Sequence, residues 1–228
     1  MIQSLTRCYS VRAASDARTQ KEDKMLCLQC QQQYELSADR CPSCGKLSPE
    51  TLDHAKRGFL EYVQVGSECL ALRNALQAAM RHSGTYRRDA LESQKEIFRR
   101  NFKKELSTKG DLYQEQITDA QHIRVLEEVS NKLSIEHGAI LHGSRLRLGI
   151  AQKALNLYLK FLWCLDSSRA TPPHCPIDRM ILQSAGVYEN WTELDSIEKY
   201  SDWIEQLRST AAQAHYSCLS EWELRIWG

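Results

Sequence analysis

The chain has 228 residues, of which 42% are hydrophobic and 26% are charged, and its formal net charge is +1 at pH 7. This composition excludes a disordered or fibrous protein and predicts one sizeable core with a small accessory module. Because the total charge is nearly balanced, an argument for nucleic-acid binding must rest on local clusters of basic residues. No run of eighteen apolar residues occurs, so we expect no membrane span.

Residues 1–24 are polar and carry five basic side chains without sustained periodicity. We interpret them as a basic N-terminal arm, which either lies along nucleic acid or is a solvated tail.

The sequence Cys27-Leu28-Gln29-Cys30 is followed, after ten intervening residues, by Cys41-Pro42-Ser43-Cys44-Gly45. The two-residue spacing within each pair lets both sulfurs reach one ion, and the intervening segment brings the second pair round to complete a tetrahedron. We therefore expect the four cysteines to hold Zn²⁺ in a closed, structural site.

This stretch, residues 27–45, resembles a zinc ribbon, a family whose members carry two such cysteine pairs on short strands. The resemblance implies a four-thiolate zinc site that serves nucleic-acid contact, protein contact or bracing. Iron in a rubredoxin-like site is the alternative, because those sites also contain Cys-Pro-x-Cys-Gly. Gln31 stands where a glycine would follow the first pair, which favours zinc.

The other five cysteines are scattered and odd in number: Cys8, Cys69, Cys164, Cys175 and Cys218. This pattern does not favour a disulfide framework, so we expect a reducing, cytoplasmic location.

From Ser48 onward, apolar residues recur at helical spacing, and glycines and prolines divide the chain into six to eight helices. The predicted fold is mostly α, a multi-helix domain with a small N-terminal zinc-ribbon module. We divide the chain into the arm (1–24), the zinc ribbon (25–47) and the helical domain (48–228). The main helices are expected near residues 48–63, 67–83, 87–106, 112–133, 150–165, 177–186 and 196–214, with a short one at the end of the chain.

Two stretches are locally basic. The helix expected at 87–106 has a net charge of +3, with the cluster Arg99, Arg100, Lys103 and Lys104 near its end. Such a cluster either contacts phosphates or forms a solvated helix face.

The second basic stretch, residues 137–165, contains no acidic residue but carries Arg145, Arg147 and Lys153. Residues 144–148 alternate like an extended segment and lead into a helix whose first N–H groups are expected to be free, which is a suitable place for a phosphate. The Lys-Ser/Thr pair of a P-loop is missing. The alternative is an internal helix with a few solvated arginines.

The proline-rich loop 166–176 surrounds His174 and Cys175. Arg169 and His174 match the Arg-x4-His spacing that resembles the higher-eukaryote-and-prokaryote-nucleotide-binding (HEPN) ribonucleases, so a hydrolase using this pair is one alternative. A cysteine nucleophile, a second metal site and plain packing of the turn stay open. His122 is predicted to be a partly buried core histidine.

From Gly186 onward, eight acidic residues face three basic ones, and Trp191, Trp222 and Trp227 lie in this segment. The tryptophans suit either a protein interface, which would make the chain an adaptor, or burial in the core.

The leading hypothesis is a non-catalytic, zinc-binding subunit of a larger nucleoprotein complex, for example in bacterial antiviral defence, such as a CRISPR-type effector, or in a mobile element. Its expected partners are DNA or RNA and other protein subunits. The residues expected to neutralise phosphates are Arg99, Arg100, Lys103, Lys104, Arg145, Arg147 and Lys153.

Overall fold

The computed structural model describes residues 24–27, 29–35 and 37–226. The expected N-terminal arm therefore lies outside the described residues, except for Lys24. The described part contains eight α-helices and one two-stranded sheet, which confirms the prediction of a mostly α protein. In this part of the chain, no helix has the length and apolar character needed to cross a membrane.

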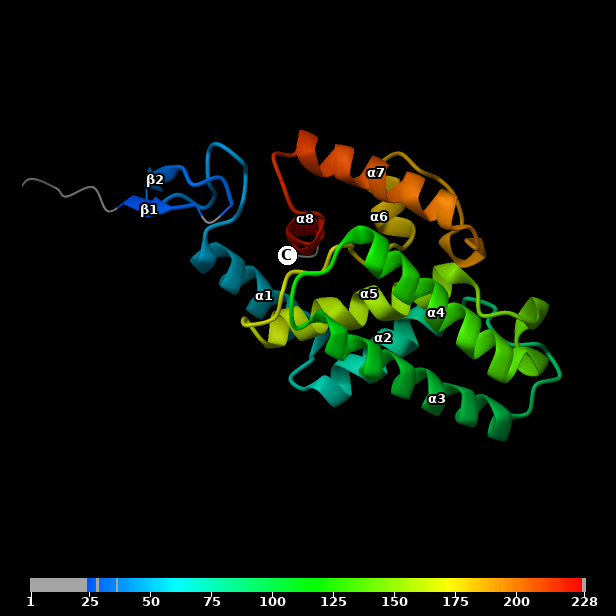
Figure 1. Ribbon diagram of the computed structural model, residues 1–228. Helices are drawn as coiled ribbons and strands as arrows, with labels where there is room; N and C mark the ends of the chain where they lie inside the picture. Colours follow the sequence, from blue (N-terminus) through cyan, green and yellow to red (C-terminus); the bar gives the residue numbers. More distant parts are fainter. Residues whose placement is uncertain (1–23, 28, 36, 227–228) are drawn as a thin grey trace, which may run out of the picture.

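The sheet forms the start of the cysteine-rich module. Strands β1 (Lys24–Leu26) and β2 (Gln33–Glu35) pair antiparallel, with Met25 opposite Tyr34. Tyr34 is buried among the cysteines, and Arg40 and Leu47 form an isolated bridge where the chain leaves the module. Figure 1 shows the module beside the helical body, joined to it by α1.

Helices α1 (Pro49–Val63) and α2 (Glu68–Met80) occur where the sequence predicts them. The Ser48 hydroxyl caps α1 by accepting from the Thr51 N–H, and Pro49 suits the first turn, where its missing N–H costs nothing. Both helices pack mainly on α5 (Leu148–Leu165) rather than on each other.

Helix α3 (Glu92–Gly110) begins five residues later than the sequence predicts. Residues 85–87 are held in an extended bridge to 140–142, with Arg87 N–H donating to Ile140 O at 2.9 Å. The helix then begins where the Gln94 side chain accepts from Leu91 N–H. Long-range backbone pairing thus overrides the helical pattern of residues 87–91.

Helix α4 (Asp119–His137) also begins later than predicted, at a capping box in which Thr118 and Gln121 bond each other's backbone N–H groups. A 3₁₀ turn, η1 (Asp111–Tyr113), follows α3 directly. Two more 3₁₀ turns, η2 (Gly138–Ile140) and η3 (His142–Ser144), lead from α4 toward α5.

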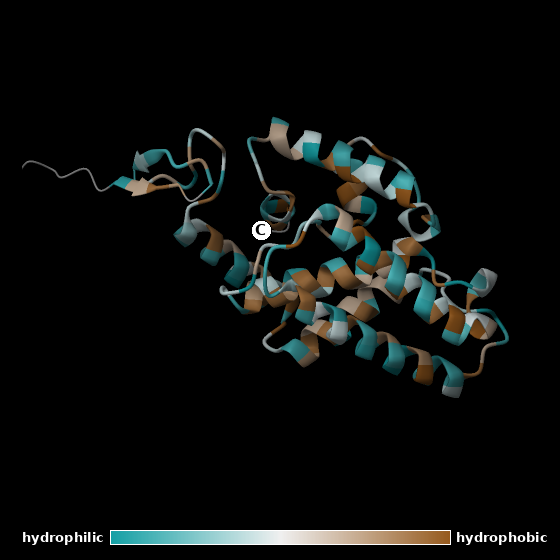
Figure 2. Cartoon of the chain, in the orientation of Figure 1, coloured by the Kyte–Doolittle hydropathy of each residue, from teal (hydrophilic) through white to brown (hydrophobic). Residues whose placement is uncertain are grey.

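Helix α5 is buried along nearly its whole length and is the central helix, as predicted. It appears in Figure 2 as a mostly hydrophobic ribbon crossed by other helices. Its buried polar side chains hold the proline-rich loop: Gln152 bonds both backbone groups of Ile177, and Asn156 donates to Cys175 O at 3.0 Å. These polar side chains of the core helix therefore supply hydrogen-bond partners for backbone groups of the buried loop, which would otherwise have none.

The segment after the proline-rich loop consists of α6 (Arg179–Ser184), the 3₁₀ turn η4 (Trp191–Glu193), α7 (Ile197–Gln213) and α8 (Leu219–Ile226). Helix α8 packs on both α1 and α7 and lies near the centre of the view in Figure 1. The last helix is therefore part of the core.

Candidate metal centre and nucleic-acid interface

The four predicted cysteine ligands meet in space. Their sulfur atoms all lie within 4.8 Å of one another, and two of the pairs, Cys27–Cys44 and Cys30–Cys41, are 3.6 Å apart. Four thiolates placed about 2.3 Å from a tetrahedral metal would be separated by roughly 3.8 Å. The donor set and its spacing therefore fit a four-thiolate metal site.

The backbone of each cysteine pair supports ionised sulfur. Desolvation raises the pKa of the Cys27 thiol, but hydrogen bonds from the backbone N–H groups of Cys30 and Gln29 outweigh it and bring the pKa down to about 6. The backbone N–H groups of Cys44 and Ser43 act on Cys41 in the same way and lower its pKa against the effect of burial. Metal binding requires the thiolate, which this backbone arrangement favours at Cys27 and Cys41, whereas burial and the neighbouring sulfurs raise the pKa of Cys30 and Cys44.

The module is docked on the turn between α7 and α8. The Arg40 guanidinium donates to the carbonyl groups of Ala214 and His215 and to Tyr216 Oη, and it stacks over the Tyr216 ring at 4.4 Å. Gly45, with φ of +74°, packs so closely that a Cβ atom there would overlap the His215 carbonyl oxygen. Glycine is thus required by both its conformation and its neighbour.

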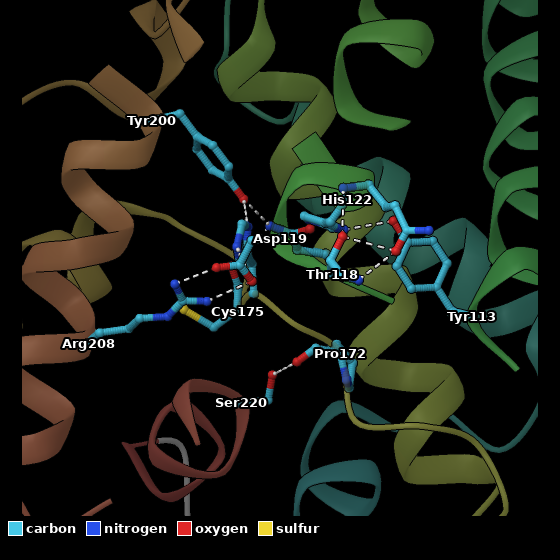
Figure 3. Close-up of polar contacts among 12 residues, drawn as sticks. Tyr113, Thr118, Asp119, His122, Pro172, Cys175, Tyr200, Arg208 and Ser220 are labelled. Atoms are coloured by element: carbon cyan, nitrogen blue, oxygen red, sulfur yellow. Dashed lines mark hydrogen bonds and ion pairs between the residues drawn. The ribbon is translucent and has the colours of Figure 1, made fainter. Parts of the chain in front are cut away.

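Helix α8 connects the module with the rest of the core through three buried polar side chains. Glu221 accepts from the Leu47 backbone N–H at 3.2 Å. Ser220 donates to Pro172 O at 2.8 Å, a contact drawn in Figure 3, and Glu223 forms an ion pair with Lys160 of α5 at 2.6 Å. All three α8 side chains are almost fully buried.

Within α8, the tryptophan and the two glutamates are internal, whereas the six acidic residues between Gly186 and α8 are exposed. Trp222 is 5% exposed, and Glu221 and Glu223 are each 1% exposed. Because these side chains face inward, α8 does not contribute them to a protein interface, and an adaptor surface on the acidic segment from Gly186 onward stays a prediction. Trp227 lies outside the described residues.

The side chains before and within α5 that were expected to bind phosphate bind other groups of the same chain. Arg145 forms an ion pair with Asp195 at 2.8 Å, and Arg147 donates to Ser83 O at 2.8 Å. Lys153 is buried and pairs with Asp178.

Backbone N–H groups at the start of α5 are also hydrogen-bonded to other groups of the same chain. The Leu148 N–H donates to the Asp195 carboxylate at 3.1 Å, and the Gly149 N–H donates to Leu194 O at 2.8 Å. The prediction of free N–H groups at this helix start is therefore wrong. A carboxylate 47 residues away along the chain takes the place proposed for a phosphate, because anions of either kind suit a helix N-terminus.

The basic residues of α3 fall into two groups. Arg100 and Lys104 are exposed, while Arg99 and Lys103 are half-buried on the side that faces α2. Arg99 also donates to Glu92 at 2.6 Å. Only the second group is brought together with other basic side chains.

Arg99 and Lys103 line a cleft of about 370 Å³ between α2 and α3, which is also lined by Arg73 of α2 and by Arg81, the residue directly after α2. Among the described residues that line this cleft, these four cations are the charged ones, and none of the others is acidic. Within the described part of the chain, Arg73 and Lys103 have no ion-pair partner. The cleft, which we call the α2–α3 cleft, is therefore an anion-attracting surface.

Sequence reasoning missed Arg73 and Arg81. Residues 68–80 carry only one basic residue, so no charge run marks this helix. The signal that could have found them is spacing: Arg73, Gln77 and Arg81 are four residues apart and lie on one face of α2, as Arg99 and Lys103 do on α3.

Arg169 and His174, the pair proposed for hydrolysis, contact different partners. Arg169 lies near Asp166 and donates to Gly110 O at 3.4 Å. His174 is 1% exposed, and its Nδ1 is hydrogen-bonded to Tyr200 Oη at 2.8 Å. The two side chains thus belong to separate sets of contacts.

His174 is buried and belongs to a polar cluster at the start of α4 whose charged members, Asp119 and Arg208, are partly exposed. Its Nε2 lies 3.4 Å from Asp119, and Asp119 accepts two hydrogen bonds from Arg208, at 2.6 and 2.9 Å. Figure 3 shows Arg208 and Tyr200 reaching from α7 toward this point. His122, which is fully buried rather than partly buried, packs against the His174 ring with centroids 4.5 Å apart.

Burial and ion pairing shift the pKa values of the ionisable groups in this cluster. Contacts with His174 and Arg208 hold the pKa of Asp119 well below its ordinary value, so it is a weak base. Burial lowers the pKa of His122 and of His174 and raises the pKa of the Cys175 thiol. Neutral, enclosed groups of this kind indicate packing that joins α4, α7 and the proline-rich loop.

Comparisons with protein-family models, with curated proteins and with solved structures find no match for this chain.

Proposed function

We propose that the protein is a non-catalytic nucleic-acid-binding protein whose α2–α3 cleft binds backbone phosphates. The observation that carries this proposal is the convergence of Arg73, Arg81, Arg99 and Lys103 on one cleft. These side chains come from α2, the residue directly after it and α3, and Arg73, Arg81 and Lys103 have no ion-pair partner among the described residues. Clustered cations that are not neutralised internally are the usual basis of phosphate binding.

The four-cysteine site serves this function indirectly, as a brace that holds Zn²⁺. Four protein thiolates complete a tetrahedron and leave no open position for substrate, which is typical of structural rather than catalytic zinc. The site lies against the α7–α8 turn. Its role is therefore to order residues 40–47 and, through them, α8. As part of the same proposal, residues 27–45 form a zinc ribbon.

The set of residues proposed for phosphate contact differs from the set expected from the sequence. Arg99 and Lys103 stay in it, and Arg73 and Arg81 join it. Arg100 and Lys104 are exposed on the same helix and extend the basic surface beyond the cleft. The further expectations, association with other subunits and a role in antiviral defence or a mobile element, stay predictions.

The test is a salt series measured by fluorescence anisotropy with labelled 20-nucleotide DNA and RNA, single-stranded and duplex. We expect binding at 50 mM salt that weakens steeply toward 200 mM salt. Replacing Arg73 and Lys103 by alanine should reduce the slope of log K against log[salt] by about two, because each lost contact releases about one counterion fewer. Arg57→Ala, which removes an exposed arginine from α1, is the matched control and should leave the slope unchanged.

Two results would overturn the proposal. One is the absence of binding to every oligonucleotide at 50 mM salt. The other is binding whose salt slope is the same in the wild type, the cleft variant and the Arg57 control.

A further inference from the structure

The α2–α3 cleft has a basic rim but an apolar floor. Leu76 is 3% exposed, and Met80 and Tyr86 are half-buried; these three side chains line the same cleft as the three arginines and Lys103. A surface that binds phosphates alone gains nothing from such a floor, because phosphate oxygens need donors and charge. The floor therefore offers a place for an apolar group that accompanies the phosphates.

Tyr86 is held in position at this floor. Its ring packs edge-on against Phe98 with centroids 5.6 Å apart, and it forms the bridge to Leu141. Its hydroxyl is buried beside the Arg99 guanidinium, and the Lys95 ammonium lies 5.5 Å from the centroid of its ring. A rigid, half-buried aromatic ring beside cations is the kind of surface on which nucleic-acid bases stack.

The remaining polar residue of the cleft is Gln77, whose exposed amide lies between Arg73 and Arg81 on α2. An amide offers both donors and an acceptor, which match the edge of a base. The cleft thus combines an apolar floor for the face of a planar ring, an amide for its edge and cations for the flanking phosphates.

Duplex nucleic acid cannot use this combination, because its bases are paired and stacked inside the helix and reach a protein cleft only after costly extrusion. We infer that the α2–α3 cleft binds a single strand, with one unpaired base against Met80 and Tyr86 and the neighbouring phosphates on Arg73 and Lys103. This inference rests on the proposed function and names the class of nucleic acid that the same site takes.

The experiment compares three probes of equal length on the full chain at 50 mM salt: a labelled thymidine strand, a duplex of mixed sequence and a strand of abasic sites. The abasic strand keeps every phosphate and lacks every base. We expect the thymidine strand to bind about tenfold more tightly than the abasic strand, because stacking of a base on an aromatic side chain contributes on that scale. The duplex should bind no more tightly than the abasic strand.

Variants of Tyr86 then test whether its ring causes the preference for the thymidine strand over the abasic strand. Tyr86→Phe keeps the ring and should keep the preference for the thymidine strand. Tyr86→Leu should reduce that preference toward onefold while leaving affinity for the abasic strand unchanged. Because Tyr86 packs on Phe98, thermal melting identifies any loss of folding, and Gln77→Ala provides a second variant at an exposed position that should also reduce the preference.

Equal affinity for the thymidine strand, the abasic strand and the duplex, weakened alike by loss of Arg73 and Lys103, would overturn the inference and leave the proposed function intact. A preference for bases that survives both Tyr86→Leu and Gln77→Ala would also overturn it. Lack of binding to all three probes would overturn the proposed function itself.

Discussion

The backbone N–H of Leu47 donates to the buried carboxylate of Glu221 at 3.2 Å, across 174 residues of sequence. This bond joins the end of the cysteine-rich module to the last helix. Lys46 lies 3.6 Å from the same carboxylate, so the charge of Glu221 is partly compensated. The module is thus attached to the core by a charge-assisted hydrogen bond that water does not reach.

Removing this carboxylate should loosen the module without unfolding the helices. We expect Glu221→Ala to destabilise the protein by about 1–3 kcal/mol, because the buried Leu47 N–H loses its partner. Glu221→Gln keeps an acceptor and should cost less. Urea denaturation followed by far-UV circular dichroism measures both changes, and equal stability of Glu221→Ala and the wild type would contradict the prediction.

Removal of the metal should have a local effect. We expect a chelator to increase amide hydrogen exchange in residues 40–47 and 214–221, because the module orders the first range and contacts the second. Most of the helical signal should remain, since α2 to α7 do not belong to the module.

The control for this experiment is a variant with Cys27 and Cys44 replaced by serine, in which exchange should already be raised and should not respond to the chelator. Complete loss of the helical signal on chelation would show that the module is required for the fold as a whole. Unchanged exchange in both ranges would show that the cysteines do not hold a metal that orders the module.

Stability should fall when the pH is lowered from 7 to 5. His122 and His174 have folded-state pKa values below the ordinary value near 6.5, chiefly because of burial. Below 6.5 the unfolded chain binds protons that the folded chain does not, so stability decreases by up to about 1.4 kcal/mol per pH unit for each such histidine. Asp119 lies beside His174 and favours its protonation, so we expect a smaller contribution from His174 than from His122.

Urea denaturation at several pH values tests this dependence. His122→Gln is expected to be less stable at pH 7, because the bond to Tyr113 changes, but to lose less stability between pH 7 and pH 5. His54→Gln, at an exposed position of α1, should keep the wild-type dependence. The assignment fails if the His122 variant retains the full decrease.

The ion pair between Lys160 and Glu223 should behave as a buried pair. Each side chain is 2% exposed, and the Lys160 ammonium also lies 3.7 Å from the centroid of the Phe59 ring. Lys160→Met should cost about 3–5 kcal/mol, because it leaves an unpaired carboxylate in the core. The double variant with Glu223→Leu should recover most of this loss. Additive losses in a double-mutant cycle, measured by urea denaturation, would contradict the coupling.

The clustering of the four cysteines and most helices could be predicted from the sequence because both depend on short-range spacing. Two residues between cysteines place their sulfurs on one ion, and apolar residues at helical intervals mark α1, α2 and α5 wherever the helices pack. The starts of α3 and α4 were placed too early. In α3 the deciding contact is made by Arg87 with Ile140, which no local pattern reveals.

The fate of the basic residues was decided only by tertiary structure. Arg145 and Lys153 look available in the sequence because no acid lies near them, yet Asp195 and Asp178 reach them from later segments. The α2–α3 cleft arises in the same way, since it exists only when two helices pack and bring their arginines together. Charge acts through space over several ångströms, so its balance at any point depends on which segments the fold makes neighbours. Cysteine spacing and helical periodicity, by contrast, involve residues that are close together in the sequence, so the sequence alone determines them.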